Sequence, residues 1–106
     1  MLLLGIDIGT SSIKVSVVDA QKRHTVASAT YPEQESAILS AQPGWAEQDP
    51  AMWWEHVQQA ILKANQSGAY NPQEIAAIGI AYQMHGLVVV DKDQNVLRDS
   101  IIWCDS

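Results

Sequence analysis

The chain opens with an apolar strand that runs directly into a polar turn, a junction that few folds accommodate. Leu2–Ile6 is apolar, and the strand that it predicts continues through Asp7 to Ile8. A carboxylate at the end of a buried strand is costly unless a cation or hydrogen-bond donors meet it. Gly9 lets the backbone turn tightly and approach a ligand closely. The segment therefore predicts either a ligand-binding turn or a plain polar hairpin turn, which composition alone favours.

Polyphosphate recognition is the ligand chemistry that suits this turn. Thr10, Ser11 and Ser12 bring three hydroxyls and several backbone N–H groups that can donate to phosphoryl oxygens. Lys14 adds a positive charge, although strand alternation leaves open whether it points inward. Asp7 can bind Mg²⁺ through water. The sequence has neither the G-x-x-x-x-G-K-[ST] pattern of a P-loop nor the G-x-G-x-x-G pattern of a Rossmann fold.

Length, charge and cysteine content narrow the class of protein. The 106 residues suit one domain or part of one, and a hydrophobic content of 47% is typical of a globular chain. The net charge of −6 and the lack of a basic run argue against nucleic acid or an anionic membrane as a partner. The single cysteine, Cys104, predicts a reducing compartment, most simply the cytoplasm, and is expected to be a small buried residue.

Hydrophobic patterning predicts three consecutive strands and then a helix. Leu2–Ile8, Ile13–Asp19 and His24–Tyr31 have short links between them, which indicates an antiparallel meander. Asp49-Pro50 is a favourable helix start, with Asp as the N-cap and Pro at the first helical position. The helix is expected to end at Ser67-Gly68, with one apolar stripe made of Trp53, Val57, Ala60, Ile61 and Ala64.

The second half of the chain predicts further strands. Asn71-Pro72 opens a short helical turn, and Ile75–Tyr82 is nearly all apolar, as expected for a strand covered on both faces. Leu87–Leu97 reads as a hairpin around the turn Asp91–Asn95, and Ile101–Trp103 as a last short strand. The fold class is therefore α/β, with a mixed sheet and a crossover helix.

A second polar segment, Gln83–Gly86, follows the buried strand Ile75–Tyr82. Loops at strand ends are favoured positions for binding residues, since rigid elements place their side chains. Gln83, Met84 and His85 together can hydrogen-bond hydroxyl groups and cover the apolar face of a sugar. Structural readings stand beside this one: His85 as a hydrogen-bonding residue, Met84 as core filler and Gly86 as a plain turn.

Four segments, in this order, resemble landmarks of the FGGY carbohydrate kinases, and most of all their xylulokinase members. Asp7–Thr10 resembles the Asp-x-Gly-Thr phosphate motif of the actin-like ATPase superfamily. Pro43–Pro50 with the Trp53-Trp54 pair resembles the segment Trp-x-Glu-Gln-Asp-Pro and the helix that follows it. Gln83–Gly86 and Ile101–Asp105 resemble the family's Gln-Met-His-Gly and Ile-x-Trp-x-Asp motifs.

The resemblance spans essentially the whole chain and departs from the family pattern at Tyr82, where Gly is common. It implies a ribonuclease H-like fold of the actin-like ATPase superfamily. Residues 1–106 would then form the N-terminal portion of the first kinase domain, a partial domain without the second one. The resemblance also implies a phosphate-binding set and a sugar-binding set. These are Asp7, Gly9, Thr10, Ser11, Ser12 and Lys14 for ATP and Mg²⁺, and Gln83, Met84, His85 and Asp105 for the sugar.

The implied activity is transfer of the γ-phosphoryl group of ATP to a ketose hydroxyl, most simply D-xylulose to D-xylulose 5-phosphate. The family's catalytic carboxylate lies beyond residue 106, so the 106-residue piece is expected to be inactive alone. An exposed sheet edge is expected to favour homodimerisation or strand exchange. Two alternatives stay open: a kinase for ribulose, gluconate or glycerol, and a non-catalytic binding module on a ribonuclease H-like core.

Overall fold

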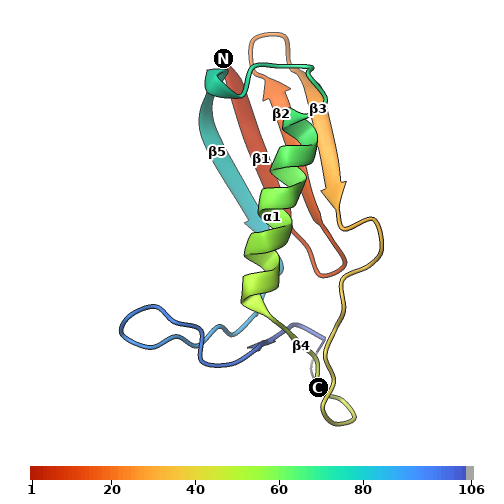
Figure 1. Ribbon diagram of the computed structural model, residues 1–106, viewed down its shortest axis with the longest axis vertical. Helices are drawn as coiled ribbons and strands as arrows, with labels where there is room; N and C mark the ends of the chain where they lie inside the picture. Colours follow the sequence, from red (N-terminus) through yellow and green to blue (C-terminus); the bar gives the residue numbers. More distant parts are fainter. Residues whose placement is uncertain (105–106) are drawn as a thin grey trace.

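The computed structural model describes residues 1–104, in which a four-stranded mixed sheet carries one helix on one of its faces (Figure 1). The strands β1 (Leu2–Ile8), β2 (Ile13–Asp19) and β3 (His24–Tyr31) form an antiparallel meander. β5 (Ile75–Tyr82) pairs in parallel with the other side of β1, so the strand order is β3-β2-β1-β5. The predicted meander and the predicted bounds of all four strands are confirmed.

The helix α1 (Pro50–Asn65) supplies the crossover between the meander and β5. The Asp49 carboxylate accepts a hydrogen bond of 2.9 Å from the Ala51 N–H, which satisfies one of the free donors at the start of the helix. Val57, Ala60 and Ala64 on the predicted stripe are buried in the core. They pack with the buried residues of the sheet, which are Leu2, Leu4, Ile6, Ile13, Val15, Val17 and Ala29.

Strand register places the two charged residues of the opening motif on the face of the sheet away from α1. Leu4 and Ile6 are buried in the core under the helix, so Asp7, the next residue in β1, points to the opposite face. Asp7 is the direct cross-strand partner of Lys14, and paired residues share a face. Both side chains are exposed.

β5 corrects one expectation from the sequence. The strand is apolar and parallel as predicted, but it is the edge of the sheet, and within the described residues neither of its faces is fully covered. Ile78, Ile80 and Tyr82 are 61%, 59% and 74% exposed. The apolar run indicates that the strand is suited to burial, but it does not indicate which segment would pack over it.

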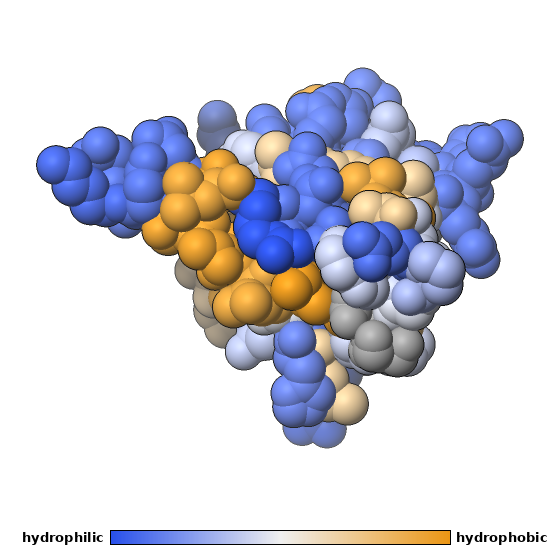
Figure 2. Space-filling model, turned by 90° about the horizontal axis from the view of Figure 1, so that it is seen from below, coloured by the Kyte–Doolittle hydropathy of each residue, from blue (hydrophilic) through white to orange (hydrophobic). Residues whose placement is uncertain are grey.

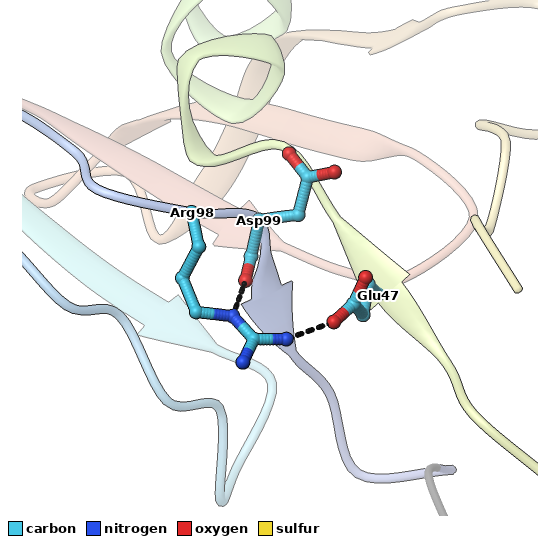
Figure 3. Close-up of polar contacts among 3 residues, drawn as sticks. All are labelled: Glu47, Arg98 and Asp99. Atoms are coloured by element: carbon cyan, nitrogen blue, oxygen red, sulfur yellow. Dashed lines mark hydrogen bonds and ion pairs between the residues drawn. The ribbon is translucent and has the colours of Figure 1, made fainter. Parts of the chain in front are cut away.

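A second, two-stranded sheet lies beyond the end of the main sheet and had not been predicted in this form. β4 (Glu47–Gln48) pairs antiparallel with β6 (Ser100–Ile101). Arg98 joins the same two segments: its guanidinium forms an ion pair with Glu47 and donates a 3.1 Å hydrogen bond to the Asp99 carbonyl (Figure 3). The last strand is therefore Ser100–Ile101, one residue before the predicted start, with its partner in the loop that precedes α1.

The predicted hairpin over Leu87–Leu97 is reduced to a single bridge between Val90 and Val96. The Asp91 carboxylate caps the turn, and its hydrogen bonds from the Asn95 backbone and side chain, and from the Asp93 N–H, lower the pKa of Asp91. Most apolar side chains of this loop are exposed, namely Leu87, Val88, Val90, Val96 and Leu97. Figure 2 shows apolar surface gathered on this end of the molecule, beside a hydrophilic projection.

Several side chains differ from their predicted environments. Cys104 is exposed, not buried. The sequence predicts His56 as a solvated surface residue, but His56 is half-buried and meets the Tyr31 ring edge-on at 5.1 Å. Trp53 is half-buried, and Trp54 is exposed. The predicted short helical turn is confirmed as the 3₁₀ helix η1 (Pro72–Glu74), with Asn71 as its cap. No helix within residues 1–104 is long and apolar enough to cross a membrane.

The packing of α1 gives a direct test of the fold. Val57 is 5% exposed, whereas Val88 in the loop after β5 is 43% exposed. We expect Val57→Ala to lower the free energy of unfolding by roughly 2 kcal/mol, because it leaves a cavity in the core. The matched substitution Val88→Ala should change it by less than about 0.5 kcal/mol. Urea denaturation followed by circular dichroism measures both, and equal losses would contradict this core.

Candidate functional site

The two polar segments singled out in the sequence meet at one end of the sheet. β1 and β5 are parallel, so the turn after β1 and the turn after β5 lie side by side. The Gln83 N–H donates to the Ile8 carbonyl at 3.0 Å and continues the parallel pairing past the strand. The Thr10 hydroxyl donates to Gln83 Oε1 at 3.3 Å and links the turns through side chains.

The turn between β1 and β2 is closed tightly and needs glycine at its first position. The Gly9 N–H donates to the Ser12 carbonyl at 3.1 Å. A Cβ atom on residue 9 would lie 2.9 Å from that same oxygen, closer than real Cβ contacts allow. The glycine is therefore required by space in this turn. The Ser11 carbonyl accepts from the Ser36 N–H at 2.7 Å, which braces the turn from the outside.

Asp7 and Lys14 line one cavity of about 500 Å³ on the open face of the sheet. The orientation of Lys14, left undecided by the sequence, is therefore toward the same space as Asp7. Small residues from three strands, Gly5, Ser16 and Gly79, also line it, together with Ile6, Ile80 and Ala81. No group of three or more His, Cys, Asp or Glu side chains that could hold a metal occurs among residues 1–104. A single carboxylate is still enough for Mg²⁺ that is also bound by water and phosphate.

Gln48 is the centre of a buried polar network that sequence reasoning missed. Its side chain is fully buried. Its Nε2 donates to the Thr10 carbonyl at 2.7 Å and to the Ala37 carbonyl at 3.4 Å. Its Oε1 accepts from Trp53 Nε1 at 3.0 Å and from Gln83 Nε2 at 3.2 Å. The Gln48 amide thus joins four segments: the turn after β1, the loop before β4, the helix α1 and the end of β5.

Trp103 extends this network to the end of the described chain. Its indole N–H donates to the Thr10 hydroxyl oxygen at 2.6 Å. Trp103 also lines a cavity of about 390 Å³ together with Tyr82, Gln83 and Met84. The sequence placed Trp103 inside a motif without giving it a role. Its contact with a residue 93 positions earlier could not be read from local spacing.

The predicted sugar-side residues are only partly free for a ligand. Met84 is 69% exposed and borders the cavity of about 390 Å³. His85 is exposed and has a φ of 61°, which puts a non-glycine residue in the left-handed region. Such strain concentrates at binding sites. Gln83 is half-buried with its amide already engaged, and Asp105 lies outside the described residues.

Comparison with known proteins assigns this arrangement to a family. Residues 2–106 match the N-terminal domain of the FGGY family of carbohydrate kinases. The chain therefore belongs to the FGGY carbohydrate kinases, whose members have the actin-like ATPase fold. The resemblance found in the four sequence motifs is confirmed, and so is the predicted fold class.

The relatives include kinases that are named for different substrates. The chain is 36% identical over 104 residues to a xylulose kinase of Escherichia coli strain K12, covering 98% of this chain and 20% of that protein. A solved structure described as a xyloylose kinase from Brucella ovis has 34% identity and a TM-score of 0.90, covering 99% and 21%. A gluconate kinase structure from Lactobacillus acidophilus has 31% identity and a TM-score of 0.83, covering 98% and 20%. The chain thus spans about a fifth of the length of these relatives.

The tight turn after β1 can be tested without any ligand. We expect Gly9→Ala to lower the free energy of unfolding by about 1–3 kcal/mol, because the new methyl group collides with the Ser12 carbonyl. Gly79→Ala is the matched control, since a Cβ atom there meets nothing within 4 Å. It should change stability by less than about 0.5 kcal/mol. If thermal denaturation finds the two variants equally stable, the turn is not built as described.

Proposed function

We propose that the protein containing this chain transfers the γ-phosphoryl group of ATP to a hydroxyl of a ketose, most simply D-xylulose, giving D-xylulose 5-phosphate. The observation that carries the proposal is the direct contact between the turn after β1 and the turn after β5 through Thr10 and Gln83. A kinase must hold a phosphate donor and a hydroxyl acceptor side by side. Membership in the FGGY family and the likeness to xylulose kinases support it.

On the phosphate side, we assign Asp7, Gly9, Thr10, Ser11, Ser12 and Lys14 to ATP and Mg²⁺. The Thr10 hydroxyl already donates its proton to Gln83, so its backbone N–H is the better group for a phosphoryl oxygen. The Ser11 and Ser12 hydroxyls make no recorded hydrogen bonds within residues 1–104 and are left for the ligand. Glycine at position 9 allows the turn to close tightly, because a Cβ atom there would collide with the Ser12 carbonyl, and the closed turn presents the residues that follow it. Asp7 would hold Mg²⁺ through water, and the ion would offset phosphate charge.

On the sugar side, we assign Met84 and His85, with Gln83 as their support. Met84 and the Trp103 indole offer apolar surface to one side of a sugar ring, and both line the same cavity. The exposed His85 ring can hydrogen-bond hydroxyl groups. Asp105 remains a prediction for this side of the site.

For the transfer itself, the ketose hydroxyl oxygen forms a bond to the γ-phosphorus, the bond to the β–γ bridging oxygen breaks, and ADP leaves. The hydroxyl proton must pass to a base. The residues that line the cavity of about 390 Å³, as far as the described chain goes, are Tyr82, Gln83, Met84 and Trp103. None of them is a carboxylate. We therefore propose that the base comes from another part of the whole protein and that residues 1–106 bind without turnover.

A second sugar is the alternative within this class. The similarity to a gluconate kinase structure supports it. The described lining of the cavity also offers few groups that could distinguish one arrangement of hydroxyls from another. Glycerol and ribulose kinases belong to the same alternative. A binding module without catalysis is the alternative from a different class.

Titration calorimetry with D-xylulose and with MgATP tests the proposed sites. We expect weak binding of each to the 106-residue chain. Met84→Ala should weaken D-xylulose binding by roughly fivefold, since part of the apolar contact is lost, and should leave MgATP binding unchanged. Leu97→Ala is the control, as Leu97 is exposed and lines neither assigned cavity. Binding of neither ligand would favour the module, and sugar-dependent ADP release by the 106 residues would contradict the proposed base.

We also propose that the open edge of β5 supports self-association of these 106 residues. The strand contains no charged residue and no proline, the usual protections of an edge. Ile80→Lys should shift sedimentation at high concentration from dimer toward monomer, because a charge then lies at the pairing edge. Lys22→Glu in the exposed turn before β3 is a control for a change of charge alone. A monomeric wild-type chain at millimolar concentration would refute this assembly.

A further inference from the structure

We infer that Gln48 is a positioning residue that sets the orientation of the Trp103 indole, two hydrogen-bonded residues away, and thereby shapes the proposed sugar cavity. Gln48 lines neither of the two assigned cavities, so it acts only through other side chains. Its complete burial and four hydrogen bonds distinguish it from the other polar residues of the described chain.

The direction of the Gln48 amide is determined by its two fixed neighbours. The Trp53 indole nitrogen can only donate, so it must face Gln48 Oε1. The Thr10 carbonyl can only accept, so it must face Gln48 Nε2. A flipped amide would set donor against donor and acceptor against acceptor inside the protein, which is strongly unfavourable.

This direction passes along the network to the cavity wall. Because Gln48 Oε1 is an acceptor, Gln83 must present Nε2 to it and turn Oε1 toward Thr10. The Thr10 hydroxyl then donates to Gln83 and keeps its lone pairs for the Trp103 indole N–H. Each bond of the series therefore depends on the amide at position 48.

Gln48 also binds the backbone of the turn after β1, at the Thr10 carbonyl. Its 2.7 Å bond to the Thr10 carbonyl is among the shorter hydrogen bonds of the network. The same side chain thus supports Thr10 from its backbone and, through Gln83, from its hydroxyl. If the proposed function holds, Gln48 connects the turn after β1, which would bind the nucleotide, to the turn after β5, which would bind the sugar.

Two substitutions test this role. Gln48→Glu keeps the shape and the Oε1 acceptor but replaces the Nε2 donor group with a second acceptor oxygen, which would face the Thr10 carbonyl. Gln48→Met keeps the approximate volume without charge and serves if the glutamate variant does not fold. Val57→Ala is the control, because it weakens the core without touching the network.

Hydrogen exchange of the Trp103 indole N–H, measured by ¹⁵N NMR under native conditions, gives the readout. We expect this exchange to be roughly tenfold faster in Gln48→Glu or Gln48→Met than in the wild type. It should stay at the wild-type rate in Val57→Ala. Unchanged exchange in both position-48 variants, or an equal increase in Val57→Ala, would overturn the inference.

Sugar affinity provides a second arm, which rests on the proposed function. Gln48→Met should weaken D-xylulose binding about fivefold or more, since the Trp103 wall is no longer held. Wild-type affinity in a Gln48→Met variant with fast indole exchange would overturn the claim that the wall matters for the sugar. A wild-type chain that binds no sugar contradicts the proposed function instead, and the exchange comparison then decides the role of Gln48 alone.

Discussion

The buried amide of Gln48 is the contact on which the arrangement of this end of the molecule depends. The main sheet and α1 have an apolar core of their own, but the turns that leave the sheet do not. The strands β4 and β6 are short, so side-chain hydrogen bonds add to the backbone bonds that join these loops. A single amide does this for four segments because it has two donors and two acceptor lone pairs, all used.

The parallel pairing of β1 with β5 brings together the two turns that form the proposed site. Two turns that are more than 70 residues apart in the sequence emerge at one edge of the sheet and are joined by the bond between Thr10 and Gln83. Asp7 on β1 and its cross-strand partner Lys14 on β2 lie on the open face of the same sheet. The residues proposed for phosphate and for sugar therefore lie close together because α1 makes the crossover that places β5 parallel to β1.

The regular elements could be predicted because their patterns are local. Strands β1, β2, β3 and β5 have apolar periodicity and short links, and Asp49-Pro50 identifies the start of α1. Gln48 was missed, although it stands directly before that cap. A glutamine in a loop is usually solvated, and only long-range partners such as Trp53 and Thr10 explain its burial. The role of Trp103 was hidden for the same reason.

Exposed apolar residues account for the wrong predictions of burial. Ile78 and Ile80 lie in an apolar run that is typical of a covered strand, yet both are exposed. Whether they are covered depends on segments that are distant in the sequence. The prediction of a hairpin over Leu87–Leu97 was wrong for a similar reason. A pattern of apolar residues does not determine whether two segments form a full ladder or a single bridge. Periodicity reports what a segment can bury, and the rest of the fold decides whether it does.

Chemical-shift mapping by NMR tests the central claim, that the turns after β1 and β5 form adjoining halves of one site. Titration with MgATP should move the backbone amides of Gly9–Ser12, and D-xylulose should move those of Met84 and His85. Each ligand should also move the Trp103 indole resonance, which contacts both halves through Thr10 and the shared cavity. Shifts confined to other surfaces, or no shift at saturating ligand, would contradict the account.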